Sequence, residues 1–334
     1  MRLGFWPPVY GNWIMTDDPA EGIGSYEYVK QTTLLADRCG FDTLLLAEHF
    51  IHPNGEKLDL VDAWTTATAL AALTENIEII AAVKPGLRAP GVTAKMATSI
   101  DHISKGRFAI NLVSAWWLPE YEMLGAPVLS HDVRYARSAE YIDVMKGLWT
   151  ENDFSYVGEF YDIKQASIAP KSIQTPHVPI YIGGESEQGR ALGARVADIF
   201  LINGRPLDEI KEIVADMKKR ADINERKLKF GMSAFVICRE TEEAAQLEFQ
   251  RLLSLLHTNI KGGDKEVVMH KYLAEVEKVG TNGGTIAGLV GTPEQIAERM
   301  HEFESLGIET FLLQYHPTLE ELERFSSEVM PLLK

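Results

Sequence analysis

Residues 77–114 read IEIIAAVKPGLRAPGVTAKMATSIDHISKGRFAINLVS and contain one complete strand, helix, strand repeat. The runs IEIIAAV and RFAINLVS are almost continuously apolar, whereas VTAKMATSIDHIS between them has its apolar residues at helical spacing. A strand that is apolar along its whole length is typical of a parallel sheet that helices cover. The stretch therefore predicts a βαβ unit, in which a helix joins two parallel strands.

The same alternation of strand-like and helical patterns continues from end to end. Eight such units in a single run predict a closed (β/α)8 TIM barrel of class α/β, with insertion segments, rather than an open doubly wound sheet. No linker or low-complexity tract divides the chain, so we expect one domain over 1–334. The six further strand-like runs are RLGFWPP (2–8), FDTLLLAEH (41–49), PIYIGG (179–184), ADIFLI (197–202), FGMSAFVI (230–237) and ETFLLQ (309–314).

A bare barrel of this kind needs about 250 residues, and this chain has 334. The remainder must be insertions, which the pattern places at 116–131, 152–177 and 257–291. In the last of these, the KGGD and TNGG clusters interrupt the periodicity. We expect a mobile insertion over about 258–291.

Composition narrows the class of partner. The chain carries 33 Lys and Arg against 48 Asp and Glu, a formal charge of −15, and it has no basic run that would bind nucleic acid. Its apolar stretches are strand-sized, too short to cross a membrane, and its start does not resemble a signal peptide. We therefore expect a cytoplasmic protein. Cys39 and Cys238 lack metal or redox spacing and suit buried thiols, so no metal is expected.

Barrels of this class place their chemistry at the C-terminal ends of the strands. One such end is IGGESEQG at 182–189, where Gly184, Glu185 and Ser186 join a strand to the start of a helix. Free backbone N–H groups and the positive end of the helix dipole attract phosphate there. The alternative is an ordinary turn in which Ser186 only caps the helix.

A second strand end is FAINLVSAWW, in which Asn111 interrupts an apolar strand. A buried amide needs a hydrogen-bond partner, which is either a structural group or a ligand. Ser114 and Ala115 are small enough for a flat ring to approach the backbone. Trp116 and Trp117 suit either the wall of a pocket or the core.

A third candidate is the helix start HDVRYARSAEY at 131–141. His131, Arg134 and Tyr135 bring an imidazole, a guanidinium and a phenol into one turn, which suits a phosphate. A solvated helix start explains the same residues equally well.

These motifs together resemble the flavin-dependent monooxygenases of the bacterial luciferase-like superfamily. The resemblance covers nearly the whole chain, and it is greatest to the branch that contains dimethylsulfone, pyrimidine and alkanesulfonate monooxygenases. The segments that carry it are FWPPVYGNW (5–13), KMATSIDHISKGRFAINLVS (95–114), NLVSAWW (111–117), PEYEMLG (119–125), HDVRYARSAEYIDVMKGLW (131–149) and PIYIGGESEQG (179–189).

The resemblance implies a barrel that binds reduced FMN, supplied by a separate NAD(P)H-dependent flavin reductase, and uses O2 to oxygenate a small organic substrate. The chain has no GxGxxG motif of its own for a dinucleotide, which agrees with a borrowed reductant. The resemblance also implies a homodimer or homotetramer. We expect the apolar helix at 63–73 to lie in that interface.

The resemblance also assigns roles to particular residues. Asn111 is expected to meet the isoalloxazine edge, and a non-prolyl cis peptide is expected at Ala82–Val83, against the ring. Residues 114–116 are expected to line the ring. The phosphate is expected to lie among His131, Tyr135, Gly184, Glu185 and Ser186.

For the reaction itself, LLAEHF at 45–50 resembles luciferase, in which a histidine at the position of His49 acts as a base. The alternative is that Glu48 and His49 only pair with each other or with the barrel rim. QYHP at 314–317 resembles the end of the eighth strand of alkanesulfonate enzymes, with Tyr315 matching their tyrosine.

The seventh strand argues against an alkanesulfonate substrate, because Ser233 and Phe235 stand where alkanesulfonate enzymes have arginine and histidine. This favours a small neutral substrate such as dimethylsulfone. Alkanesulfonates are the second choice, with Lys84, Arg88 or Arg205 as the anion-binding groups. Two other classes stay open: a barrel that uses deazaflavin F420 as its hydride carrier, and a flavin-binding protein without turnover.

Overall fold

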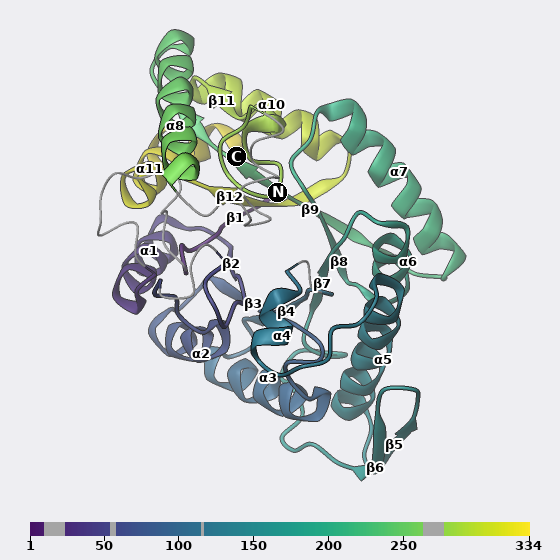
Figure 1. Ribbon diagram of the computed structural model, residues 1–334. Coiled ribbons are helices and arrows are strands. Elements are labelled where there is room, and N and C mark those ends of the chain that lie inside the picture. Colours follow the sequence, from purple (N-terminus) through teal and green to yellow (C-terminus); the bar gives the residue numbers. More distant parts are fainter. Residues whose placement is uncertain (10–23, 54–57, 115–116, 263–276) are drawn as a thin grey trace.

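The computed structural model describes residues 1–9, 24–53, 58–114, 117–262 and 277–334, and its centre is a closed barrel of parallel strands (Figure 1). Each of the eight predicted strand regions contributes one barrel strand, so the predicted fold class is confirmed. Around the barrel the order is β1 (Arg2–Phe5), β12 (Ile308–Gln314), β9 (Lys229–Phe235), β8 (Ile199–Ile202), β7 (Ile180–Gly183), β4 (Phe108–Leu112), β3 (Glu78–Val83) and β2 (Thr43–Leu46).

Helices surround this barrel on its outside (Figure 1). Several begin at a residue whose side chain accepts a hydrogen bond from the first turn, namely Ser25, Asp62, Ser186 and Thr292. The larger helices are α1 (Tyr26–Cys39), α2 (Ala63–Leu73), α3 (Pro90–Ser104), α5 (His131–Thr150), α6 (Glu187–Val196), α7 (Leu207–Ile223), α8 (Glu242–Gly262) and α10 (Pro293–Ser305), followed by α11 (Thr318–Arg324).

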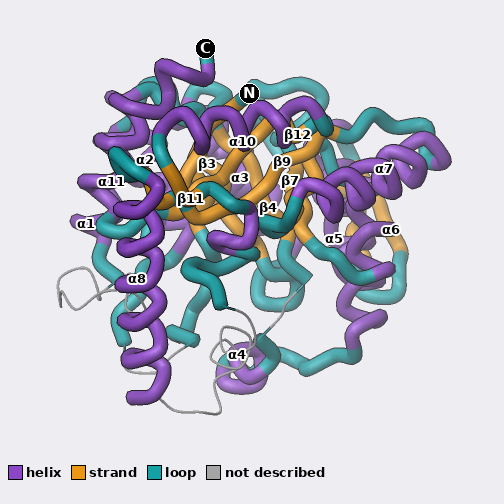
Figure 2. Tube along the Cα trace, turned by 90° about the horizontal axis from the view of Figure 1, so that it is seen from above, coloured by secondary structure: helices purple, strands orange, loops and turns teal. Residues whose placement is uncertain are grey.

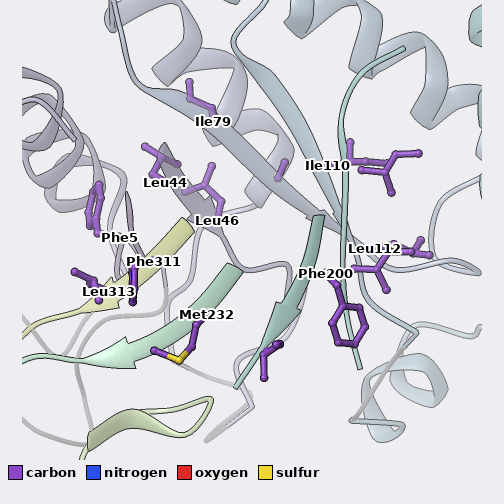
Figure 3. Packing of buried hydrophobic residues seen from close by; sticks show 14 of the residues in the cluster. Phe5, Leu44, Leu46, Ile79, Ile110, Leu112, Phe200, Met232, Phe311 and Leu313 are labelled. Carbon is purple, nitrogen blue, oxygen red and sulfur yellow. The ribbon is translucent and has the colours of Figure 1, made fainter. Parts of the chain in front are cut away.

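Alternate residues of each strand face opposite sides of the barrel wall. The outward-facing residues, such as Phe5, Ile110 and Phe311, form the main core between strands and helices (Figure 3). The inward-facing residues form a separate cluster, to which six strands contribute. That inner cluster is Leu45, Ile80, Ala109, Tyr181, Ile199 and Leu312, with Trp6 and Leu201 packed against it.

A hydrogen-bonded polar group around the buried Tyr181 closes the N-terminal end of the barrel. The Tyr181 hydroxyl donates to Glu78 at 2.8 Å and accepts from the Arg2 guanidinium at 3.1 Å. Thr43 also donates to the Glu78 carboxylate, at 3.3 Å. Because this end is filled by side chains that satisfy one another, chemistry in the barrel interior is left to the opposite end, which we call the mouth.

The predicted insertions are short added elements. The first contains α4 (Pro119–Met123), and the second forms the hairpin of β5 (Phe154–Val157) and β6 (Asp162–Ala166), which projects from the barrel in Figure 1. In Figure 2, α4 lies at the opposite end of the molecule from the N-terminus.

The third insertion begins later than predicted, because α8 continues to Gly262. Its residues 263–276 lie outside the described part, so the expected mobility stays a prediction. Beyond them lie η1 (Gly284–Ala287) and β11 (Val290–Gly291), which pairs with β10 (Ile237–Cys238). The chain ends in η2 (Phe325–Val329) and η3 (Met330–Leu333).

One expectation was wrong. In the described residues every cis peptide precedes a proline, so Ala82–Val83 is not cis. The reason is that Ala82 and Val83 pair in register with Asn111 and Leu112 inside β3 and β4.

The expected place of α2 in an interface stays a prediction. Most of its apolar residues are buried within this chain, whereas Leu73 at its end is exposed.

The two cysteines are free thiols that differ in burial. Cys238 is buried as expected, and burial raises its pKa to about 12, as suits an unreactive group. Cys39 is only half-buried, so the expectation of a buried thiol was wrong there. No helix in the described ranges has the length and apolar character needed to cross a bilayer.

Replacing glycine by alanine at two helical positions is predicted to change the free energy of unfolding in opposite directions. A methyl group at Gly193 in α6 would lie 2.5 Å from a ring carbon of the buried Phe200. At Gly91 in α3 the nearest neighbour would be Leu148 at 3.8 Å, an ordinary contact. We expect Gly193→Ala to lower the free energy of unfolding by about 1–3 kcal/mol through overpacking, and Gly91→Ala to raise it by about 0.5 kcal/mol through helix propensity. Urea unfolding of both variants tests this, and equal effects would contradict the described packing.

Candidate active site at the barrel mouth

The two-residue alternation of the strands selects the side chains that point into the mouth. Leu45, Ile80 and Ala109 face inward, so Ala82 and Asn111, each two residues further along its strand, face inward one layer higher. One step beyond, His49 follows β2 and Lys84 follows β3, and the two side chains meet. The predicted residues His49, Ala82 and Asn111 therefore come together on three adjacent strands.

Asn111 is a buried amide with an unused acceptor. Only 6% of the residue is exposed, and no described residue donates to its Oδ1 atom. The indole Nε1 of Trp6, which packs against the inner cluster, likewise has no acceptor among the described residues. An unpaired buried polar atom costs roughly 1–3 kcal/mol. Two such atoms on inward-facing side chains are expected where a ligand supplies the missing partners.

The side chains of His49, Lys84 and Glu120 form a buried polar cluster, which we call the mouth triad. Lys84 Nζ lies 3.1 Å from His49 Nδ1 and makes a short contact with Glu120 Oε2. Glu120 Oε1 accepts from the backbone N–H of Phe50 at 2.7 Å and lies 3.4 Å from His49 Nδ1. All three residues are at most 6% exposed.

Burial and charge determine the protonation of the triad. Burial raises the pKa of Glu120, but its contacts with His49 and Lys84 outweigh that and bring it to about 2. Burial lowers the pKa of His49 against the opposing pull of Glu120, and the Lys84 charge lowers it further. Burial also lowers the pKa of Lys84, whose charged form the contact with Glu120 favours. These directions favour an ionised Glu120 carboxylate and a neutral His49 imidazole.

Glu48 does not pair with His49, as one reading of the sequence proposed. Its carboxylate accepts from the backbone N–H of Lys84 at 2.8 Å and from Arg88 Nε at 2.7 Å. Arg88 also bonds Asp62 at 2.8 Å and lies over the Trp64 ring. Burial raises the pKa of Glu48 to about 7 against the opposing pull of Arg88. This group joins the ends of β2 and β3 to the start of α2.

The loop that carries Lys84 is fixed from the other side as well. The Pro85 carbonyl accepts from the Tyr121 hydroxyl at 3.0 Å and from Arg137 at 2.9 Å. Gly86 has φ +95°, and a methyl group there would lie 2.4 Å from the Arg137 guanidinium. Only glycine allows this approach, so α4 and α5 together hold the position of Lys84.

The predicted phosphate residues also gather. The Tyr135 hydroxyl lies where a methyl group on Gly184 would meet it at 3.0 Å, so that position is kept open by glycine. The His131 and Tyr135 rings are 4.9 Å apart. Ser114, which follows β4, connects the mouth to this region. Its hydroxyl lies 2.9 Å from the hydroxyl of Ser138, which is on α5 like His131 and Tyr135.

Ser186 and Glu185 differ in what they offer a phosphate. Ser186 caps α6 by accepting from Gly189 N at 3.1 Å, which leaves its hydroxyl proton as a donor. The Glu185 carboxylate instead turns to Arg205 and accepts from Asn203 N at 3.2 Å. Glu185 can therefore contribute only its backbone N–H to the site.

The strand ends on the far side of the mouth are covered by the chain itself. Ser233 Oγ donates to the Asn282 carbonyl at 2.9 Å, and Gly204 N donates to the same carbonyl at 2.8 Å. The Gln314 amide accepts from Thr281 N at 2.9 Å and donates to Thr281 O at 3.2 Å. We call residues 280–284 the mouth segment.

The expectation that Tyr315 acts at the mouth was wrong. Leu312 faces inward, so Tyr315, three residues on, faces outward, where it packs against Phe41 and Phe325. Burial raises the pKa of its hydroxyl well above the ordinary value. Phe235 is also fully buried, in a cluster with Val279 and α8.

Two predicted residues, Ala115 and Trp116, lie outside the described ranges. Trp117 is described, and its ring centre lies 6.1 Å from that of His49.

The sequence analysis did not identify Glu120 as a site residue and treated Lys84 as a rim cation. The available signal was the lysine that ends the apolar run EIIAAV, directly before a Pro-Gly turn. Within the described ranges no cluster of His, Cys, Asp and Glu could hold a metal ion.

Comparison with known proteins finds relatives that match along the whole chain. An FMNH(2)-dependent dimethylsulfone monooxygenase of Pseudomonas putida is 33% identical over 347 residues, covering 100% of this chain and 95% of the relative. A protein of the same description from Pseudomonas fluorescens (strain Pf0-1) is 30% identical, with 100% and 94% covered.

The solved structure of a riboflavin lyase, with modified FMN and riboflavin, matches the fold with a TM-score of 0.82 at 20% identity, covering 100% of this chain and 91% of that one. The family model described as luciferase-like monooxygenase matches residues 5–310. The chain therefore belongs to the luciferase-like monooxygenase family.

Proposed function

We propose that this protein is an FMN-dependent monooxygenase that uses reduced flavin and O2 to oxygenate a small, neutral organosulfur compound such as dimethylsulfone. The observation that carries the proposal is the inward-facing Asn111 amide, whose buried Oδ1 atom has no donor among the described residues. Two relatives that match the whole chain are FMNH(2)-dependent dimethylsulfone monooxygenases. The complete set of eight barrel strands argues against a truncated protein without turnover.

The residues at the mouth fit FMN. Asn111 and Trp6 offer an acceptor and a donor with no partner in the described ranges, next to the small side chain of Ala82. A phosphate fits between Tyr135 and the start of α6, where Gly184 leaves space and the first backbone N–H groups of the helix are available. His131, beside Tyr135, and the Ser186 hydroxyl complete this phosphate site.

Bound reduced FMN supplies the electrons with which O2 is activated. The protein positions the reacting groups and limits water. Asn111 orients the ring edge through its amide, Trp117 shields the side of His49, and His49 faces the same space from β2. Excluding water from the closed site protects reactive intermediates from side reactions.

A neutral substrate follows from the pairing of every cation proposed for a sulfonate. Lys84 pairs with Glu120, Arg88 with Glu48 and Asp62, and Arg205 with Glu185 and Glu209. Freeing any of them for an anion would leave a buried or half-buried carboxylate without its partner, which is costly. At the end of β9, Ser233 is occupied with the mouth segment.

The partners follow from the same proposal. A separate NAD(P)H-dependent flavin reductase supplies the reduced FMN. We also propose a cytoplasmic location and a homodimer or homotetramer. That assembly rests mainly on the family resemblance, because most apolar residues of α2 are already buried within the chain.

The phosphate site predicts a selective effect of removing one hydroxyl. Tyr135→Phe removes a hydrogen bond to a charged group, worth about 1.5–3 kcal/mol, and should weaken FMN binding about tenfold or more. Riboflavin, which has no phosphate, should bind both proteins equally. Flavin fluorescence titration measures both ligands. Tyr156→Phe, on the outer β5–β6 hairpin, is the matched control. Equal losses for FMN and riboflavin would remove Tyr135 from the phosphate site.

Replacing Asn111 is predicted to raise the stability of the protein and to lower its activity. Asn111→Leu keeps the shape of the side chain and removes a buried acceptor without a partner, so the flavin-free protein should be more stable by about 1 kcal/mol. Its kcat/KM for oxygenation should fall at least about tenfold, since the contact to the ring is lost. Thermal unfolding and product assays measure the two effects. A large loss of stability would instead make Asn111 a structural residue.

The substrate proposal is tested by direct competition. The enzyme, a flavin reductase, NADH and O2 are offered dimethylsulfone or a C2 to C8 alkanesulfonate series, with catalase present. Dimethylsulfone should yield methanesulfinate and formaldehyde, since one oxygen atom enters the product and the other leaves as water, while sulfite from the sulfonates should stay at the level of the Asn111→Leu control. Sulfite release without sulfone turnover would reverse the ranking.

A further inference from the structure

We infer that Lys84 holds His49 in the tautomer that carries its proton on Nε2, so that the ring has no free lone pair and does not act as a base. Lys84 is thus a positioning residue that acts through His49. The tautomer stands on the geometry of the mouth triad alone. The catalytic consequence rests on the proposed function.

The first argument is the donor inventory of the Lys84 to His49 contact. An ammonium group has three N–H donors and no acceptor, so the atom that it contacts must offer a lone pair. Lys84 Nζ lies 3.1 Å from His49 Nδ1, a hydrogen-bond distance. A proton on Nδ1 would place two N–H groups head to head. Nδ1 therefore accepts, and a neutral ring then carries its proton on Nε2.

The competing arrangement has His49 Nδ1–H donating to Glu120. That contact is longer, at 3.4 Å to Oε1, and the same oxygen already accepts from Phe50 N at 2.7 Å. This arrangement would also require Lys84 to be a neutral amine that accepts a proton from the ring. The buried Glu120 carboxylate would then lose its cation, which is strongly unfavourable in a site that excludes water.

Proton affinity gives the same answer. A proton shared between Nζ and Nδ1 resides on the more basic group, and free lysine is about four pKa units more basic than free histidine. Among the described residues, the charged groups that act on His49 include Lys84, Glu120 and His52. Burial lowers the pKa of both Lys84 and His49 and so disfavours a second positive charge, while the contact with Glu120 favours the charged form of Lys84.

The surrounding loops keep Lys84 in place for this role. Its backbone N–H donates to Glu48 at 2.8 Å, and the next residue, Pro85, is held through its carbonyl by Tyr121 and Arg137. With the Nδ1 lone pair directed at Lys84 and Nε2 protonated, the ring has no lone pair with which to take a proton from a substrate.

Histidine tautomers are read directly from the ring nitrogen signals of ¹⁵N-histidine-labelled full-length protein. The chain has nine histidines, so His49→Gln identifies the signals of His49 by their loss. At pH 7.5 and without flavin we expect an unprotonated Nδ1 and a protonated Nε2. A protonated Nδ1, or averaging between the two tautomers, would overturn the inference on the unmodified protein.

Removing the cation should reverse the tautomer. In Lys84→Met, Nδ1–H becomes free to donate to Glu120, and the pKa of His49 should rise because a carboxylate is left without its cation. Lys95→Met, which removes an exposed ammonium group on α3 that donates to the Ala169 carbonyl at 2.6 Å, should change nothing.

These outcomes separate the inference from the proposed function. An unchanged tautomer in folded Lys84→Met would show that another group sets the proton position. All spectra are recorded without flavin or substrate. A failure of the oxygenation assay therefore leaves the tautomer result valid, and a wrong tautomer leaves the assignment as a monooxygenase intact.

Discussion

Every side chain of the site is placed by one constraint, the strict alternation of inward and outward residues in a closed parallel barrel. Because no strand of a closed barrel has a free edge, shifting one strand by a single residue would exchange its core face for its lumen face. Leu45, Ile80 and Ala109 therefore fix His49, Lys84 and Asn111 at the mouth. The same parity sends Tyr315 outward into the helical layer.

The buried ion pair of Lys84 and Glu120 is formed jointly by the barrel and one of its insertions. The barrel supplies a lysine at the end of β3, and α4, a five-residue helix in an insertion, supplies the carboxylate. Burying either charge alone would cost a large desolvation free energy. In the pair the two charges cancel, and Phe50 and His49 supply further hydrogen bonds. Apart from α4, the residues that keep this pair in place come from the loop after β3 and from α5, which explains the convergence of Tyr121 and Arg137 on Pro85.

The sequence predicted the barrel because continuous apolar strands such as EIIAAV leave few alternatives to a parallel sheet. Asn111, which interrupts an apolar strand, and His49, which the resemblance singled out, both lie buried at the mouth, and their contact with flavin is part of the proposed function. Glu120 could not be predicted, because a short helix in an irregular loop has no periodicity that indicates which way its side chains point. Tyr315 failed for a related reason, since similarity at the end of a strand does not reveal the parity of the residue.

The mouth segment has a consequence for how this enzyme could change. Its contacts with Ser233, Gln314 and Gly204 run through main-chain atoms of Thr281 and Asn282, and Gly283 approaches Gly204 so closely that a methyl group there would lie 2.1 Å from a carbonyl oxygen. A basic side chain at position 233 would meet backbone instead of open space. Adaptation toward charged substrates thus requires coordinated replacement of several positions, and the steps between are disfavoured by epistasis.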